Sequence, residues 1–238
     1  MLAIHVPDHL HHRLNAHGGV VVLNHKTGQW HALNATAGLL WQNWRDGTGF
    51  EQSVAAVATR HPDVPAERLR SDAAQLAGEL VRRGLLEVGP DLLAEGDAAT
   101  MAEVALPAGE APGRLASVTA FLVLLTAALL IRAPFRLAYA TVRFTRRWCR
   151  PETSVTRATK IVTAVERSTR YYPGRAACME KSLAAVLMAA FAGRCLNWCL
   201  GAAPDPYRFH AWVEVGDEPV VAPGDFTQPR QYLRVLTL

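Results

Sequence analysis

The stretches Cys178-Met-Glu-Lys-Ser-Leu-Ala-Ala-Val-Leu-Met188 and Phe209-His-Ala-Trp-Val-Glu-Val215 decide how the second half of this chain folds. A Pro-Gly pair interrupts the chain shortly before the first stretch, so Cys178 is predicted near the start of a helix. Alternate residues of the second stretch are apolar, which predicts a strand with His210 on its other face. A helix N-terminus favours a thiolate, and a nearby imidazole can take the thiol proton. The two stretches therefore predict a cysteine nucleophile with a histidine base; two buried core residues are the plainer interpretation.

Composition limits the class of protein. The chain has 238 residues, half of them hydrophobic, and a net charge of +4. This mild basic balance has no long Lys/Arg run, so a solvated surface is favoured over nucleic-acid binding. The N-terminus lacks the basic region and apolar run of a signal peptide, which predicts the cytoplasm and no disulfides. The four cysteines are Cys149, Cys178, Cys195 and Cys199.

The first 88 residues predict a winged helix-turn-helix. Short strands are expected over residues 3–33, with a hairpin connection at 24–29. Helices follow at 36–44, 50–60 and 66–83, by the spacing of their apolar residues, and residues 85–88 return as an edge strand. Such folds often bind DNA, but acidic and basic residues alternate on the third helix, which disfavours a phosphate-contacting face.

Several motifs of this region resemble the PqqD-like family, the recognition elements that bind leader peptides of ribosomally made natural products. They are Gly19-Val-Val-Val-Leu-Asn, Gly28-Gln-Trp-His-Ala-Leu-Asn, Ala37-Gly-Leu-Leu-Trp and Arg83-Gly-Leu-Leu. The resemblance implies that the leader adds a strand to the hairpin edge, beside the third helix, which is a physically sensible mode of peptide binding. Plain core packing is the alternative for the apolar members. The implied binding residues are Trp30, His31, Ala32 and Leu33 on the strand, and Leu69, Asp72, Ala73 and Leu76 on the helix.

Residues 89–113 are rich in Gly, Pro, Ala and acidic residues and are interpreted as a linker to a second domain at 114–238. That domain opens with the apolar run 115–131, which is shorter than a usual membrane span. A buried helix is the favoured interpretation, and peripheral contact with a membrane surface through 115–131 is the alternative. Further helices are expected at 136–150 and 156–172.

The second domain resembles the transglutaminase-like leader peptidases of lasso-peptide biosynthesis, the B proteins. The shared motifs are Arg132-Ala-Pro-Phe, Cys178-Met-Glu-Lys-Ser-Leu-Ala, Phe209-His-Ala-Trp-Val-Glu-Val and Tyr232-Leu-Arg-Val-Leu. Fusion to a PqqD-like module occurs in the same family. The resemblance implies an α+β chain: an N-terminal PqqD-like winged helix-turn-helix and a C-terminal domain with the helix and antiparallel sheet of papain and transglutaminase.

The resemblance also implies chemistry. Cys178 would attack the carbonyl at the leader–core junction, His210 would act as base and then acid, and water would release the leader. The partners would be the precursor peptide and an asparagine-synthetase-like macrolactam cyclase; no nucleic acid, metal or cofactor is expected. The family's third member, an Asp on the returning strand, is replaced here by Ala222. If Gly216-Asp217 is a two-residue turn, Asp225 lies on the same face as His210 and is the candidate orienter.

Three alternatives stay open: an inactive leader-binding scaffold, a winged-helix DNA-binding regulator, and acyl transfer to an amine instead of water. Cys195 and Cys199 have a spacing that could ligate metal on a helix, but no matching histidines stand nearby, so two core thiols are favoured. Glu180 and Lys181 are expected to be exposed or structural.

Overall fold

The computed structural model describes residues 4–88, 114–149, 154–174, 176–203, 207–223 and 228–238. The chain divides into two compact units, one formed by Met1–Asn24 with Gln29–Thr100 and the other by His25–Gly28 with Met101–Leu238. The predicted linker 89–113 lies outside the described residues, so its extent stays a prediction. Each unit is described by itself below.

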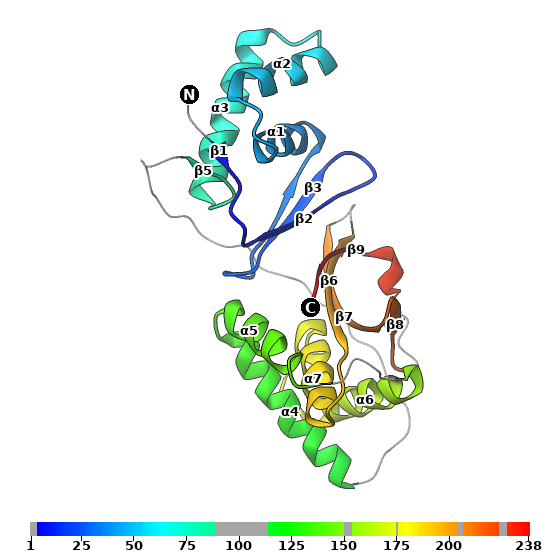
Figure 1. Cartoon of the computed structure of the whole chain (residues 1–238). Helices are drawn as coiled ribbons and strands as arrows, with labels where there is room; N and C mark the ends of the chain where they lie inside the picture. The colour runs from blue at the N-terminus through cyan, green and yellow to red at the C-terminus, as the bar shows by residue number, and fades with distance from the viewer. Residues whose placement is uncertain (1–3, 89–113, 150–153, 175, 204–206, 224–227) are drawn as a thin grey trace. The chain divides into compact units, whose positions relative to one another are not determined.

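The N-terminal unit carries two small antiparallel sheets and three helices (Figure 1). The larger sheet has the order β2-β3-β4, which leaves β4 at an edge, and the smaller one pairs β1 with β5. Asn34 caps α1 by accepting a hydrogen bond from the backbone N–H of Ala37 at 2.9 Å, as its position before the apolar spacing predicts. The elements are β1 (Ile4–His5), β2 (Leu10–Leu14), β3 (Val20–Asn24), β4 (Trp30–Leu33), α1 (Ala35–Arg45), α2 (Phe50–Arg60), α3 (Ala66–Arg82) and β5 (Glu87–Val88).

One hydrophobic core holds the N-terminal unit together. Two almost fully buried indoles of α1, Trp41 and Trp44, lie in it beside Val20 and Val22 of β3. The indole N–H of Trp41 donates to the carbonyl of Leu85 at 3.3 Å, which ties α1 to the chain entering β5. Burying side chains of this size supplies most of the favourable free energy of folding.

The C-terminal unit packs helices on a four-stranded antiparallel sheet with the order β8-β7-β6-β9 (Figure 1). Helix α7 contacts the sheet through β7 and β6 and is packed in turn by α4, α5 and α6. The α+β class predicted from the sequence is confirmed. The elements are α4 (Arg114–Arg132), α5 (Phe135–Thr145), α6 (Val155–Ser168), η1 (Thr169–Tyr171), α7 (Cys178–Phe191), β6 (Asn197–Ala203), β7 (Arg208–Val215), β8 (Glu218–Val220), η2 (Pro229–Gln231) and β9 (Leu233–Thr237).

Helix α7 is the buried centre of this unit. Its members from Leu183 to Leu187 are all nearly inaccessible. Trp198 of β6 donates its indole N–H to the hydroxyl of Ser182 at 2.9 Å, which fixes the helix on one face of the sheet. A helix that is apolar almost all round needs such burial. The position of Cys178 at its first residue is therefore set by the packing of the whole helix.

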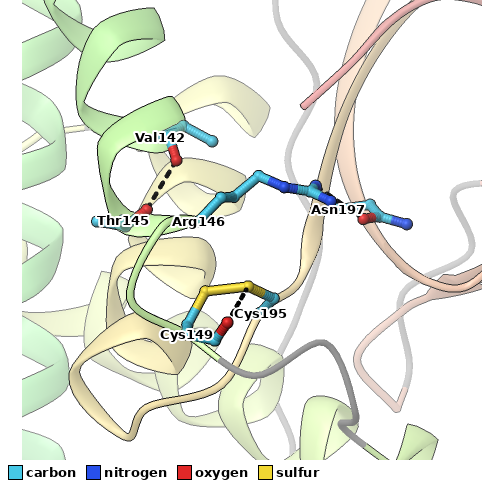
Figure 2. The surroundings of a disulfide bond; sticks show 6 residues. All are labelled: Val142, Thr145, Arg146, Cys149, Cys195 and Asn197. Atoms are coloured by element: carbon cyan, nitrogen blue, oxygen red, sulfur yellow. Dashed lines mark hydrogen bonds between the residues drawn. A yellow bond between two sulfur atoms is a disulfide. The ribbon is translucent and has the colours of Figure 1, made fainter.

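A disulfide joins Cys149 to Cys195, with a Cα–Cα distance of 5.4 Å (Figure 2). It connects the turn after α5 to the turn before β6, and Arg146 donates to the side-chain carbonyl of Asn197 beside it at 2.9 Å. The expectations of no disulfide and of a core thiol at Cys195 are therefore wrong. The first rested on the absence of a signal peptide and the second on the absence of histidines that could complete a metal site. Sequence spacing gives no sign that residues 46 positions apart would meet.

Among the described residues, no helix combines the length and the apolar character that a membrane span requires. Helix α4 buries one side, including Leu124 and Ala127, as expected for a helix packed in a domain. Its other side exposes Val118, Leu122 and Leu129. Peripheral membrane contact through 115–131 stays a prediction.

Candidate active site and peptide-binding surface

Cys178 is the first residue of α7, as predicted, and is a free thiol of intermediate exposure. Burial raises the pKa of the thiol above its ordinary value. Hydrogen bonds from the backbone N–H groups of Ala211, Met179 and Cys178 itself, and the charge of Lys181, act in the opposite direction but do not outweigh burial. The helix N-terminus thus favours the thiolate as expected, yet the resting sulfur keeps its proton and needs a base.

The contact with Ala211 places the sulfur beside the strand that carries His210. Ala211 follows His210 directly on β7, and its backbone N–H reaches the Cys178 sulfur. β8 pairs with β7 only from Val213 to Val215, so Ala211 lies beyond the described β7–β8 ladder. The structure therefore brings together the helix start and the strand segment that the sequence singled out.

The imidazole of His210 lies among aromatic rings. It stacks nearly parallel to Trp212, with ring centroids 6.0 Å apart and an interplanar angle of 9°. The ring of Tyr232, just before β9, lies 5.0 Å away at 34°. Trp212 shares the face of His210 because the two residues are two positions apart on a strand. The sequence showed this shared face without assigning Trp212 a role, and nothing in it pointed to Tyr232 as a neighbour.

Asp225 lies outside the described residues. Its predicted role depended on a two-residue turn at Gly216-Asp217, and the structure has that turn: Val215 pairs with Glu218, and Gly216 has φ 62°. Continuing that register would set Pro223 opposite His210, but the described strand β8 ends at Val220. Asp225 as the orienter of His210 stays a prediction.

Glu180 and Lys181 hold the start of α7. Glu180 is buried, and its carboxylate accepts a hydrogen bond from the backbone N–H of Ala177 at 2.5 Å and lies 3.9 Å from the guanidinium of Arg132. Lys181 forms a partly exposed ion pair with Glu166 at 3.1 Å. The roles are structural, as expected, although Glu180 is not exposed. A carboxylate in the first turn also complements the helix dipole.

The helix residues predicted to bind a peptide all line one pocket of about 180 Å³ in the N-terminal unit. The pocket lies among α1, α2 and α3 and is mostly apolar, with Asn34, Thr36 and the acidic Asp72 as its polar members. The α1 and α2 contributions were missed by the sequence interpretation, because apolar residues on these helices were assigned to the core. Its lining residues are Asn34, Thr36, Ala37, Leu40, Val54, Val57, Leu69, Asp72, Ala73 and Leu76.

The four predicted strand residues divide between the two faces of the sheet. His31 pairs with Val22 and Leu33 with Val20, so these two face the helical core, whereas Trp30 and Ala32 lie on the opposite face. Burial, and secondarily the Arg83 guanidinium, lower the pKa of His31, and its Nε2 is buried with no hydrogen-bond partner among the described residues. Strand β4 does present the free edge that strand addition requires.

Comparison with known proteins gives the same division of the chain. The family model for coenzyme PQQ synthesis protein D (PqqD) matches residues 19–86, and that for the transglutaminase-like superfamily matches residues 121–237. No curated protein matches the chain. A solved structure, TbiB1 in complex with the TbiA(beta) leader peptide, is similar at 23% identity over 34% of this chain and 93% of its own, with a TM-score of 0.33.

The two family matches cover the regions whose motifs carried the resemblance. The PqqD match spans β4, α3 and all the residues that line the pocket, and the transglutaminase-like match spans Cys178, His210 and Tyr232. The chain thus joins a PqqD domain to a transglutaminase-like domain.

Proposed function

We propose that this protein is the leader peptidase of a lasso-peptide pathway, binding the leader of a precursor through its PqqD domain and hydrolysing the leader–core bond. The observation that carries the proposal is the free thiol of Cys178 at the start of α7, held against the backbone N–H of the residue that follows His210. This arrangement suits a cysteine nucleophile with a histidine base.

The reaction proceeds by acyl transfer. His210 takes the proton of Cys178 as the sulfur attacks the carbonyl carbon at the junction, and the proton passes to the leaving amine of the core peptide. The resulting thioester is hydrolysed by water that His210 deprotonates, which frees the leader carboxylate. Backbone N–H groups at the start of α7 supply positive charge for the oxyanion. Because burial keeps the resting thiol protonated, proton transfer to His210 is part of the attack.

Cleavage of a precursor peptide, followed by intact mass, tests the chemistry. The wild-type protein is expected to release leader and core, and Cys178→Ala and His210→Ala to lose this activity. Cys199→Ala removes the other free thiol and serves as the control that should retain it. Unchanged cleavage by Cys178→Ala would remove the nucleophile from the mechanism, and a wild type that binds leader without cutting it would favour the inactive-scaffold alternative.

Leader binding is proposed to occur by strand addition to β4. The hairpin closes with a hydrogen bond from the N–H of Asn24 to the carbonyl of Gln29. Because backbone hydrogen-bonding groups alternate in direction along an antiparallel strand, the backbone N–H and C=O groups of His31 and Leu33 then point toward β3. The N–H of Ala32 is left at the free edge. Ala32→Pro removes that donor without removing one from the β3–β4 ladder, whereas Ala32→Ser keeps it. Weaker leader binding by the Pro variant alone is the expected result, measured by calorimetry.

The core peptide that cleavage releases is a suitable substrate for a macrolactam cyclase. Cleavage leaves the core peptide with a new N-terminal amine, which an asparagine-synthetase-like cyclase would join to an acidic side chain as a macrolactam. Adding such a cyclase to the cleavage reaction should convert the core into a species lighter by one water. A cleaved species heavier by an added amine would instead indicate acyl transfer in place of hydrolysis.

A further inference from the structure

The face of the sheet that carries His210 holds a chain of polar contacts that runs from a buried indole to an exposed turn. The indole N–H of Trp212 donates to Glu214 Oε1 at 2.8 Å, and the other carboxylate oxygen, Oε2, pairs with the guanidinium of Arg234 on β9 at 2.5 Å. Arg234 also contacts Asp217 in the β7–β8 turn at 3.2 Å. Trp212 and Glu214 are only 5% and 4% exposed, so each is held by its partners.

Trp212 is fixed from a second side by Gly201 of β6. Gly201 pairs with His210 across the β6–β7 ladder, and a Cβ built on it would lie 2.7 Å from the Trp212 ring. The indole therefore occupies space that only glycine leaves open. The close approach to Gly201 and the hydrogen bond to Glu214 restrict movement of the ring from two sides.

His210 is in contact with this fixed ring and with Tyr232, which is itself 6.3 Å from Trp212. Aromatic stacking of this kind limits rotation of an imidazole about its side-chain bonds. The carboxylate of Glu214 is bonded to both Trp212 and Arg234, so it holds the indole that stacks on the imidazole of His210.

We propose that Trp212, anchored by Glu214 and Arg234, is a positioning residue that holds the imidazole of His210 in the orientation needed to exchange a proton with Cys178. This deepens the peptidase proposal and rests on it for the identity of the base. A base misplaced by about 1 Å can cost roughly 100-fold in rate, so loosening the indole should lower kcat while leaving leader binding, and with it KM, nearly unchanged.

Trp212→Phe tests the anchor, because it keeps an aromatic ring but removes the N–H that Glu214 accepts. The matched control is Trp41→Phe, which deletes another buried indole N–H, bonded to the carbonyl of Leu85 at 3.3 Å in the N-terminal unit, and leaves the elements that carry Cys178 and His210 untouched. Both changes should destabilise the fold comparably. Only Trp212→Phe is expected to lower kcat, by roughly 10- to 100-fold, and to move the pH dependence of Cys178 alkylation by iodoacetamide.

Alkylation and the NMR titration of the His210 ring need no substrate, so they separate the two proposals. If the wild type cleaves no precursor, the leader-peptidase proposal fails, while an altered His210 titration in Trp212→Phe would still support positioning. Equal effects of Trp212→Phe and Trp41→Phe on kcat and on both pH profiles would show a merely structural role and overturn the inference.

If Trp212→Phe does not fold, Glu214→Gln is the variant that tests the anchor of the indole. It keeps an acceptor for the indole but loses the charge that pairs with Arg234. A change of the His210 titration and a loss of kcat in the same direction as predicted for Trp212→Phe would support the anchor. A Glu214→Gln protein with wild-type kcat and wild-type titration would overturn it.

Discussion

At the scale of single residues, the two free thiols of the C-terminal unit have different surroundings. Cys178 receives backbone N–H groups at a helix start, whereas Cys199, on β6, is buried near the carboxylate of Glu214. Burial first, and then the charge of Glu214 and a hydrogen bond to it, raise the pKa of Cys199 to about 12. Cys199 is therefore an inert thiol at neutral pH, and Cys178 is the one expected to react.

The Cys199 shift predicts a loss of stability at alkaline pH. Because the pKa is raised in the folded state, the folded protein keeps the Cys199 proton at pH values where the unfolded chain has released it. The contribution of this thiol to the free energy of unfolding is therefore complete below the ordinary pKa of 9.0 and is lost as pH rises toward about 12. The slope is at most about 1.4 kcal/mol per pH unit. Urea unfolding of wild type and Cys199→Ala between pH 8 and 11 should show a smaller decline in the variant. Parallel declines would contradict the shift.

The segments of Cys178 and His210, the proposed catalytic pair, could be singled out from the sequence, but the residues that surround them could not. A cysteine after a Pro-Gly break and a histidine on an alternating strand are local patterns, and the structure brings their segments together. Tyr232 reaches His210 only through the pairing of β9 with β6, a contact with no local signal. The same holds for Arg234 and Glu214, which are neighbours in space through three strands.

At the scale of elements, the disulfide is a tie between two turns of the C-terminal unit. Closing a loop of 46 residues restricts the unfolded chain and should contribute about 2–4 kcal/mol. The double variant Cys149→Ala/Cys195→Ala, or reduction of the wild type, should lower the unfolding midpoint, with Cys199→Ala as the thiol control. Equal midpoints of oxidised and reduced protein would show that the bond adds no stability. A cytoplasmic location stays a prediction, and the bond is atypical of a reducing compartment.

Gly201 limits how β6, β7 and β9 can approach one another. A Cβ at this position would meet the carbonyl of Leu233 and the ring of Trp212, both at 2.7 Å. Gly201→Ala should destabilise the protein by about 1–3 kcal/mol through overpacking, and should lower kcat because Trp212 must move. Gly49→Ala, where no atom lies within 4 Å of the added Cβ, is the matched control for denaturant unfolding and peptide cleavage. A tolerated Gly201→Ala would mean that the indole is not confined.

The helices followed from sequence more closely than the strands. The helices at 50–60 and 66–83 and the start of α7 agree with the structure within a residue, because apolar spacing marks them directly. Strand β6, the neighbour of β7, was not predicted from the sequence, since Gly201, Ala202 and Ala203 lack the branched side chains that favour strands. Its identity depends on burial between β7 and β9, which only the tertiary fold supplies.

At the scale of the whole molecule, the chain combines a PqqD domain with a transglutaminase-like domain, for which we propose peptide binding and catalysis respectively. The pocket of the N-terminal unit and the free edge of β4 offer contacts remote in sequence from Cys178. Binding one precursor at both domains would raise the effective concentration of the junction at the active site to the millimolar range. The full precursor should therefore have a lower KM than a peptide without the leader, because the leader contacts form before the chemical step.

Competition by free leader peptide tests this coupling on the intact chain. Leader alone should inhibit cleavage of the full precursor competitively, since both occupy β4, but should not inhibit a short peptide that spans only the junction. The short peptide should have a raised KM and a similar kcat. In Ala32→Pro the difference in KM between the two substrates should shrink, while Ala32→Ser keeps it. If the short peptide matched the precursor in kcat/KM, the N-terminal domain would contribute nothing to recognition, and leader binding would have to serve another step, such as delivery to the cyclase.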